Sequence, residues 1–242
     1  MKLATYNILK GGSKLVHWSK MIDEIEVDLL LVQESYPHDS HLPALLYPNI
    51  QRQSIWDKAQ PNSWGSGIFS KSGLLSRISI PSFDGWVVGS ELTLASWQVP
   101  DERLMVFCIH APDGPGSYAG QVNRILDAIA SIACERDIII GGDFNLTVSH
   151  WSGSDRKTKE RDLAIQERLT SEFGLFNCWQ EANPDKQPAQ TLRWSGDRTI
   201  PYHCDGLFVP KAWKERLESC VVLSGDDWNQ LSDHNPVVAE FR

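Results

Sequence analysis

The sequence predicts an α/β protein in which two mixed β-sheets pack face to face and helices cover their outer sides. Three observations lead to this fold class. Segments with the length and composition of strands outnumber segments with helical periodicity. Some strands come in hairpin-like pairs, whereas others follow a helix. Three of the strands are apolar almost throughout, as strands are when both of their faces are covered.

Most of the predicted strands lie in the N-terminal half. Residues 2–9 (KLATYNIL) alternate along the chain and are rich in strand formers. Residues 15–26 (LVHWSKMIDEIE) repeat apolar side chains at the spacing of a helix. The other elements expected in this half are buried strands at 27–35 and 103–112, and antiparallel strands within 63–80 and at 90–99, on either side of the turn sequence PSFDG.

The C-terminal half predicts two helices and four more strands. Residues 117–135 place aliphatic side chains on one helical face, and residues 160–173 have a similar pattern. Residues 136–146 (RDIIIGGDFNL) predict a buried strand that ends in a turn. The late strands are expected at 203–210, 218–224 and 235–241. No repeat, low-complexity tract or linker interrupts the pattern, so residues 1–242 are predicted to form a single domain.

The composition limits the function classes. The chain has 23 Lys and Arg against 31 Asp and Glu, and this net charge of -8 argues against a broad polyanion-binding surface. Nucleic acid stays open as a partner, because local basic loops or bound metal ions can hold phosphates on an acidic protein. Five scattered cysteines without a CxxC pair argue against a disulfide framework and against a zinc ribbon.

The N-terminus (MKLATYNILKGG) contains no apolar stretch of signal-peptide length, and no run in the chain approaches the length of a membrane span. We therefore expect a soluble, cytoplasmic protein, and we expect it to be a monomer. Ten tryptophans are many for 242 residues, and packing in the core and at its rim is the simplest explanation for them.

Polar side chains stand at the ends of the predicted strands. One such residue is usually a cap, a turn residue or a paired core group, because a buried carboxylate or imidazole without a partner is costly. Here the pattern recurs, and together these strand ends would form an acidic pocket with two imidazoles if they converge. The residues at the six strand ends are Asn7, Glu34, His110, Asp143 with Asn145, Asp205, and Asp233 with His234.

An acidic pocket of this kind suits a hard divalent cation. Carboxylate and amide oxygens favour Mg²⁺ or Mn²⁺ over Zn²⁺, and such an ion is the usual partner of phosphate esters. Asp233 and His234 stand side by side before the last strand. An aspartate beside an imidazole can fix the tautomer of the ring and stabilise its charged form, which suits the deprotonation of a water molecule.

Six short motifs follow one another from the first strand to the last: TYNIL, LLLVQES, CIHAP, GGDFN, YHCDGLFV and SDHNPV. In these motifs the chain resembles the endonuclease/exonuclease/phosphatase superfamily. That superfamily includes pancreatic-type deoxyribonucleases, bacterial exonuclease/AP endonucleases, neutral sphingomyelinases and inositol-polyphosphate 5-phosphatases. The resemblance implies a four-layered α/β/β/α sandwich of two mixed, mainly antiparallel sheets. It also implies metal-dependent hydrolysis of a phosphate ester.

Position by position, the resemblance implies roles for the residues around the metal ion. Asn7 and Glu34 hold the main divalent ion, with Asp233 beside it. His234 acts as the general base on the attacking water, or it stabilises the phosphoryl group that is transferred. Asp205 orients His234 by accepting its other N–H.

The resemblance also implies roles for the residues around the phosphate. Asp143 and Asn145 position the nucleophile and the scissile phosphate, and Asp143 is alternatively the base or a ligand of a second metal ion. His110 contacts a phosphate oxygen or helps to protonate the leaving group. Deoxyribonuclease-like members support this second histidine with a glutamate, for which Glu91 is the candidate in this chain.

Some positions depart from individual branches. The AP-endonuclease branch usually has an acidic residue where Leu9 stands and a tyrosine where His110 stands, which makes dedicated abasic-site repair a weaker expectation. Arg193 and Arg198 precede the YHCDG motif, as basic residues precede a CDR-type motif in the 5-phosphatases. They are therefore candidate substrate-binding residues, although glycine replaces the arginine of that motif.

Other features have both a structural and a functional interpretation. The most basic stretch, residues 152–162, is either a solvated loop leading into a helix or a loop that binds phosphate at the rim of the pocket. Trp64 and Trp151 either pack locally or stack on a base or a sugar. Cys108 and Cys204 are expected to be buried thiols.

Three functions therefore remain as hypotheses. The first is a Mg²⁺-dependent phosphodiesterase, most simply a nuclease. The second is a phosphomonoesterase or lipid-type phosphodiesterase that acts on a sugar phosphate, an inositol phosphate or a lipid head group, which suits the net charge of -8. The third is a catalytically silent binding module, and the presence of every acidic and histidine residue of the motifs argues against it.

Overall fold

Two β-sheets form the centre of the computed structural model, which describes residues 1–10, 15–93, 104–133, 136–150, 159–200 and 202–242. The first sheet contains β1 (Lys2–Asn7), β2 (Leu29–Ser35), β3 (Ser54–Lys58), β4 (Gly65–Ser70), β11 (Leu217–Val222) and β12 (Val237–Phe241). The second sheet contains β5 (Leu74–Ile78), β6 (Val87–Thr93), β7 (Leu104–His110), β8 (Ile138–Asp143), β9 (Leu175–Asn177) and β10 (Asp205–Pro210).

Both sheets are mixed and mainly antiparallel. The strand orders are β11-β12-β1-β2-β4-β3 and β5-β6-β7-β8-β10-β9. β1 pairs in parallel with β2, and β7 pairs in parallel with β8. The other strand pairs of the described residues are antiparallel. Each parallel pair lies at the centre of its sheet, where both faces are covered.

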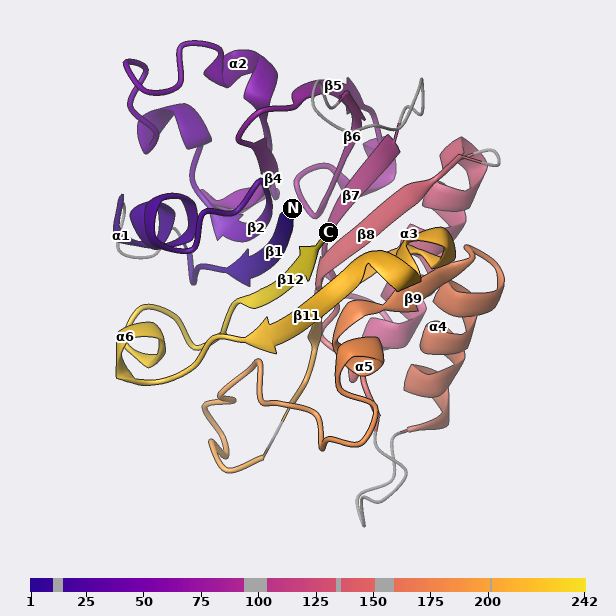
Figure 1. Cartoon of the computed structure of the whole chain (residues 1–242). Helices are drawn as coiled ribbons and strands as arrows, with labels where there is room; N and C mark the ends of the chain where they lie inside the picture. The colour runs from indigo at the N-terminus through magenta and orange to yellow at the C-terminus, as the bar shows by residue number, and fades with distance from the viewer. Residues whose placement is uncertain (11–14, 94–103, 134–135, 151–158, 201) are drawn as a thin grey trace.

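Helices cover the outer face of each sheet (Figure 1). α3 (Tyr118–Ala133) and α4 (Glu160–Ser171) pack on the second sheet. α1 (Leu15–Ser19), the π-helical turn Lys20–Glu24 and α6 (Asp226–Asn229) pack on the first sheet. The shorter elements are α2 (Ile50–Gln53), α5 (Cys178–Ala182) and 3-10 turns at His38–Ser40, Pro81–Phe83 and Lys211–Arg216.

Three apolar clusters hold these layers together. Side chains from both sheets, among them Leu31 and Leu207, fill the space between the sheets. Ile125 of α3 packs with Phe107 in the second cluster, and Trp18 belongs to the third, on the outer face of the first sheet. Each fully buried side chain of this size stabilises the fold by about 1.5–3 kcal/mol. The layers are therefore α/β/β/α, which confirms the predicted fold class.

The three predicted helices are present, with one departure. The first winds into a π-helical turn after Ser19, where the Ile25 N–H donates to the Lys20 carbonyl at 2.9 Å. Residues 63–80 form β4 and β5, which belong to different sheets. Two strands escaped prediction: β3 lies at a sheet edge with one fully buried residue, and β9 has only 3 residues. Such short or half-buried strands lack a periodic signal.

Two further expectations concern the whole chain. The described cysteines, Cys108, Cys178, Cys204 and Cys220, are buried and free, in agreement with the absence of a disulfide framework there. Across the described ranges, no helix combines the length and the apolar character that crossing a membrane requires.

Candidate active site

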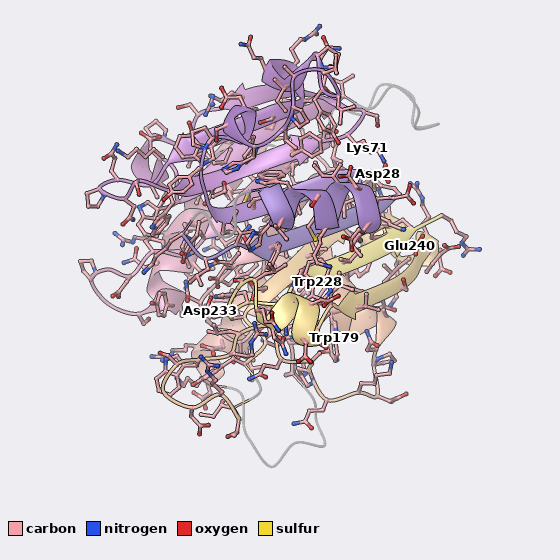
Figure 2. The ribbon with its side chains drawn as sticks, turned by 90° about the vertical axis from the view of Figure 1, so that its left-hand side faces the viewer. Asp28, Lys71, Trp179, Trp228, Asp233 and Glu240 are labelled. Atoms are coloured by element: carbon pink, nitrogen blue, oxygen red, sulfur yellow. The ribbon has the colours of Figure 1, made fainter. Side chains whose placement is uncertain are left out.

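The first sheet brings three of its strand ends to one place. β1 ends at Asn7, and its neighbour β2 carries Glu34 close to its own end. The loop before the antiparallel strand β12 holds Asp233 and His234. Asp233 precedes β12 and Glu240 lies near the end of this strand, and Figure 2 shows the two residues at opposite ends of the layer. The polar residues of the first sheet therefore gather at one edge of the sandwich.

The second sheet contributes a matching row. β7 ends at His110, β8 ends at Asp143 and β10 begins at Asp205. Asp143 pairs with His110 on one side and with Asp205 on the other, so the three residues lie in register. The row faces the first sheet, because the Asn7 side-chain amide donates to Asp143 Oδ2 at 3.1 Å. The predicted convergence of these strand ends is present in the structure.

A β-bulge turns Glu34 into this space. The pairing of β2 with β4 shifts register between Val32 and Ser35, and Glu34 has a φ of 54°. A left-handed φ in a non-glycine residue costs about 1–3 kcal/mol and is often found at functional sites. The Glu34 carboxylate accepts from the Lys10 N–H at 2.9 Å and from the Asn7 side-chain amide at 3.4 Å.

The GGDFN motif shapes the turn that presents Asp143. Gly142 has a φ of 145°, and a Cβ there would lie 1.8 Å from the Ile109 carbonyl oxygen, so only glycine fits. Asn145 has a φ of 52°, and its N–H donates to Asp143 Oδ1 at 2.9 Å. The Asn145 side-chain amide donates to the Ala111 carbonyl at 3.0 Å. The motif thus fixes one oxygen of Asp143 and leaves the other facing the pocket.

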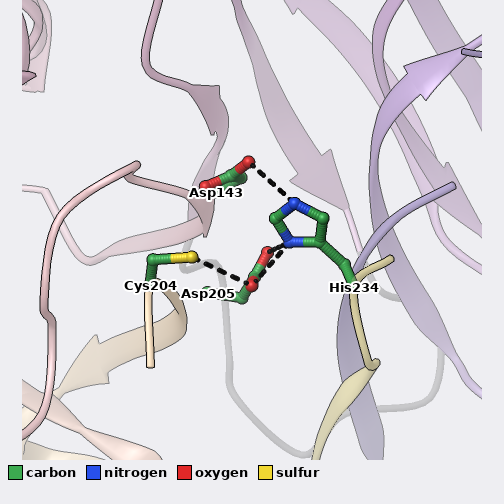
Figure 3. A group of neighbouring side chains, drawn as sticks. All are labelled: Asp143, Cys204, Asp205 and His234. Carbon is green, nitrogen blue, oxygen red and sulfur yellow. Dashed lines mark hydrogen bonds and ion pairs between the residues drawn. The ribbon is translucent and has the colours of Figure 1, made fainter. Parts of the chain in front are cut away.

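His234 is held between two carboxylates (Figure 3). Its Nδ1 lies 2.9 and 3.2 Å from the two oxygens of Asp205, and its Nε2 lies 3.7 Å from Asp143 Oδ2. Burial disfavours charge on His234, but the carboxylates of Asp205 and Asp143 outweigh burial and raise its pKa to about 10. The ring is therefore an imidazolium at neutral pH, with Nδ1 oriented by Asp205.

His110 lies in the opposite environment. Its ring centroid is 5.5 Å from that of Trp64 and 5.2 Å from that of Trp86. Burial lowers its pKa to about 4, although the Asp143 carboxylate acts in the other direction. Nε2 lies 3.8 Å from both Glu34 Oε1 and Asp143 Oδ2, and Nδ1 has no hydrogen-bond partner among the described residues. His110 is therefore a neutral imidazole.

The pocket has the chemistry of a cation site. Burial raises the pKa of Asp143 and the pKa of Glu34, because it disfavours their negative charge. Both carboxylates also accept from the Asn7 side-chain amide, so they lie close together. Asp233 Oδ1 is buried and has no hydrogen-bond partner within the described part of the chain. Buried, unpaired carboxylate oxygens are suitable ligands for a hard divalent ion.

The most compact cluster is not the expected ligand set. Asp143, Cys204, Asp205 and His234 each offer a ligand atom within 4.8 Å of the others, and all four are buried. Cys204 Sγ lies 3.5 Å from Asp205 Oδ2 (Figure 3). Because Asp205 is already engaged with His234 and this thiol, the oxygen ligands of the Glu34 side remain the better candidates for Mg²⁺.

The loop that carries His234 is fixed from behind by Arg193. Arg193 Nη1 donates to Asn235 Oδ1 at 2.6 Å, and Nη2 donates to the Ser232 carbonyl. The Ser232 hydroxyl donates to the Asn7 carbonyl at 2.7 Å and accepts from the His234 N–H at 3.1 Å. Arg193 was expected to bind substrate, but the structure engages its guanidinium in the architecture of this loop.

Two other predicted residues lie apart from the cluster. Arg198 is exposed in the loop that follows Arg193. Glu91 pairs with Met105, five residues before the end of β7, and its carboxylate binds Arg136 at 2.7 Å. Five residues of strand span about 16 Å. Glu91 therefore does not support His110 in this structure, and Trp64 and Trp86 stand beside the ring instead.

Three contributions were not visible in the sequence. Trp64 was expected either to pack locally or to stack on a base or a sugar; it is buried, and its contact with His110, which it flanks together with Trp86, was not predicted. The Thr191 hydroxyl accepts from the N–H groups of Cys204 and Asp205 at 3.0 and 3.1 Å, and so fixes the start of β10. Only the three-dimensional arrangement reveals these contacts, because no spacing in the sequence connects the residues involved.

Part of the predicted rim falls outside the described residues, namely Trp151 and residues 152–158 of the basic stretch. The end of that stretch is described: α4 begins at Glu160, and the Asp162 carboxylate accepts from the Thr147 N–H at 3.3 Å.

Comparisons with known proteins show which family and which folds the chain resembles. A model of the Endonuclease/Exonuclease/phosphatase family matches residues 4–234. A Xenopus laevis protein described as "Transposon TX1 uncharacterized 149 kDa protein" is 22% identical over 129 residues, which are 53% of this chain and 10% of that protein. The chain thus matches only about a tenth of the length of this curated relative.

Solved structures share the fold at low sequence identity. The endonuclease domain of TRAS1, a telomere-specific non-LTR retrotransposon, superposes with a TM-score of 0.66 at 16% identity, covering 100% of this chain and 98% of that one. A variant of the 3′ phosphatase NExo from Neisseria, bound to a product DNA hairpin, has a TM-score of 0.70 at 17% identity and covers 100% and 99%. At these identities the superpositions establish the fold alone.

Proposed function

The chain belongs to the endonuclease/exonuclease/phosphatase family, a family of phosphoester hydrolases, and on that premise we propose that it is a divalent-metal-dependent phosphodiesterase that cleaves nucleic acid. One observation carries the proposal. Two rows of strand-end acids and imidazoles face each other across the sandwich, so that the His234 ring, held by Asp205, and the Asn7 side-chain amide approach the same carboxylate, that of Asp143. Residues 1–242 would act as one domain, because the N-terminal β1 pairs with the C-terminal β12.

Glu34, Asn7 and Asp233 would hold Mg²⁺ or Mn²⁺. The buried Asp233 Oδ1, which has no partner among the described residues, supports this assignment, as does the raised pKa of the buried Glu34. When bound, the ion would supply positive charge and Lewis acidity to a phosphate oxygen. Ser232 and Arg193 would act as positioning residues, because they fix the loop that carries Asp233 and His234.

Asp143 and His234 would divide the work at the phosphate. The sequence left two roles open for His234, and a pKa of about 10 favours the charged role, in which the imidazolium stabilises the phosphoryl group. Burial raises the pKa of Asp143, which makes it a stronger base than an ordinary carboxylate and suits it to accept a proton from the attacking water. Asp205 would hold His234 in its orientation through Nδ1.

Asn145 and His110 would complete the phosphate site. The Asn145 N–H fixes one oxygen of Asp143, which directs the other oxygen to the water. His110 is a neutral ring with a pKa of about 4, so it would donate a hydrogen bond to a phosphate oxygen or to the leaving group without adding charge. Arg198 is exposed in a neighbouring loop, where it could reach a phosphate outside the pocket.

The choice of nucleic acid over a small phosphate ester rests on the similar structures. They include an endonuclease domain of a retrotransposon and a 3′ phosphatase bound to a DNA hairpin. The net charge of -8 argues against tight electrostatic binding of long polyanions, so we expect affinity to come from the pocket and its rim. Phosphomonoesterase activity is the second candidate.

The test compares bis(p-nitrophenyl) phosphate with p-nitrophenyl phosphate in Mg²⁺ or Mn²⁺. We expect hydrolysis of the diester, which EDTA abolishes. Glu34→Gln should raise the metal concentration needed for half-maximal rate by roughly 10–100-fold, because it removes a charged ligand and little else. Hydrolysis of the monoester alone would replace this proposal with the phosphatase, and metal-independent hydrolysis would contradict the assignment of Glu34.

A further inference from the structure

A hollow that is lined in part by Trp86, a neighbour of His110, has no part in the roles described above. The pocket has a volume of about 510 Å³ and lies between the turn at 82–86, the loop at 112–115 and the face of α3. Trp86 joins it to the active site. Trp86 is one of the lining residues, its ring centroid lies 5.2 Å from that of His110, and its carbonyl accepts from the His110 N–H at 2.7 Å.

The walls suit a flat ring with hydrogen-bonding edges. Phe83 and Trp86 provide aromatic surface, and Pro112 and Pro115 provide apolar surface. Arg124 supplies N–H donors, and the carboxylates of Asp113 and Asp127 supply acceptors. A phosphate would meet acidic residues here, whereas a neutral nucleobase can stack on the aromatic rings and bond with both kinds of polar group.

The pocket is preformed, because a buried side chain holds its walls in place. Gln121 is 3% exposed, and its amide donates to the Pro115 carbonyl at 3.1 Å. The Gln121 side-chain oxygen accepts from Arg124. A Cβ on Gly114 would lie 2.7 Å from the Gln121 nitrogen, so the loop approaches α3 as closely as glycine allows. One amide thus fixes both the loop and the guanidinium that line the pocket.

We propose that this pocket binds the nucleobase of a nucleotide next to the scissile phosphate. The inference rests on the proposed function, because it takes the phosphate to lie at His110 and Asp143. Trp86 lines the pocket and its ring neighbours that of His110, so a base in the pocket would be a neighbour of the phosphate site. The pocket therefore selects nucleoside esters over other phosphodiesters, and hydrolysis itself does not require it.

The experiment measures KM and kcat for methyl p-nitrophenyl phosphate, whose methyl group cannot stack in an aromatic pocket, and for the 5′- and 3′-(p-nitrophenyl phosphate) esters of thymidine, all in Mg²⁺. One thymidine ester should have a KM at least about fivefold lower than the simple diester, as expected for one stacked base. Phe83→Leu, which keeps apolar volume, and Arg124→Ala should each remove most of that preference. Neither should alter hydrolysis of methyl p-nitrophenyl phosphate. Arg52→Ala is the matched control, because Arg52 is exposed on α2 and does not line the pocket.

The outcomes separate the two proposals. Hydrolysis of all substrates with an unchanged thymidine-ester KM in Phe83→Leu and Arg124→Ala would overturn the nucleobase pocket and leave the phosphodiesterase intact. Failure to hydrolyse any diester would instead overturn the proposed function and the inference that rests on it. A preference for either thymidine ester that both variants lose would support the pocket and identify the side of the phosphate that it serves.

Discussion

The two imidazoles of the candidate site stand in the same pocket and yet differ in charge. His234 lies between Asp205 and Asp143, whose carboxylates raise its pKa to about 10 against the effect of burial. Burial lowers the pKa of His110 to about 4, and Trp64 and Trp86 stand beside that ring. Both side chains are buried, so burial alone cannot explain the difference. Immediate neighbours decide which histidine carries charge.

The contrast explains how one residue type can serve two functions. A fixed imidazolium can stabilise negative charge that develops on a phosphoryl group. A neutral imidazole can donate a single hydrogen bond and adds no charge. The strand register makes the contrast possible, because Asp143 pairs with both His110 and Asp205 and so faces both rings. Substitutions at either ring should therefore have different consequences for activity.

Loss of the charged ring should have the largest effect. We expect His234→Ala to lower kcat for a phosphodiester by about 10²–10⁴-fold, because it removes the imidazolium that faces the phosphate. Initial rates in saturating Mg²⁺ give the effect, and an unchanged circular dichroism spectrum shows that the fold is retained. Wild-type activity in this variant would eliminate the proposed role of His234.

Loss of the orienting carboxylate should have a smaller effect. Asp205→Asn removes the negative charge beside Nδ1, so the pKa of His234 should fall from about 10. The alkaline limb of the pH–rate profile, where His234 loses its proton, should therefore move to lower pH in the variant. At neutral pH we expect turnover to fall by roughly 10–10³-fold. Nitrogen NMR of the His234 ring follows the pKa directly. An alkaline limb that does not move would separate Asp205 from the charge of His234.

Removal of the indole ring beside His110 should lower activity only modestly. Trp86→Leu exposes the His110 ring to water, and because burial is what lowers its pKa, that pKa should rise from about 4 toward the ordinary range. We expect a loss of turnover of about tenfold or less, since the ring keeps its position on β7. Trp86→Phe, which keeps an aromatic ring, is the control. Equal pKa values for His110 in the two variants would show that the ring at position 86 does not control its charge.

His38 lies outside the candidate site and shows the effect of burial on the pKa of a histidine that does not contact Asp143 or Asp205. Burial lowers the pKa of His38 to about 3, and its partner is the Ser54 hydroxyl at 2.8 Å from Nδ1. The folded state keeps His38 neutral while the unfolded state takes up a proton below about pH 6.5, so stability falls as the pH falls. Between about pH 6.5 and 5.5 this contribution is about 1 kcal/mol. Urea denaturation of wild type and His38→Gln should show that difference, and parallel pH dependences would refute it.

The sequence located the residues of the charged half of this comparison but left the charge of His234 open. Strand-end positions and the SDH motif identified His234, Asp205 and Asp143, because short motifs keep a fixed relation to the strands that carry them. The neighbours of the neutral ring, His110, could not be predicted from the sequence. The sequence offered Glu91 as the partner of His110, but the register of β6 and β7 places it at the other end of the sheet.

The fold follows a similar rule. Long amphipathic helices and apolar central strands were predicted because their periodicity is strong, whereas the short edge strands β3 and β9 were not. Contacts between distant segments leave no periodic trace. The Thr191 hydroxyl that fixes the start of β10 and the Arg193 guanidinium that fixes the His234 loop are both of this kind. These contacts join segments that are distant in the sequence, so only the folded structure reveals them.

The central claim is that this constellation cleaves phosphodiester bonds in nucleic acid with the help of a divalent ion. Conversion of supercoiled plasmid to nicked and linear forms tests it most directly, with wild type and Asp143→Asn compared in Mg²⁺ and in EDTA. We expect nicking by the wild-type protein in Mg²⁺, at least about 10²-fold slower nicking by Asp143→Asn, and none in EDTA. Intact plasmid, together with hydrolysis of phosphate monoesters by the same preparation, would contradict the claim.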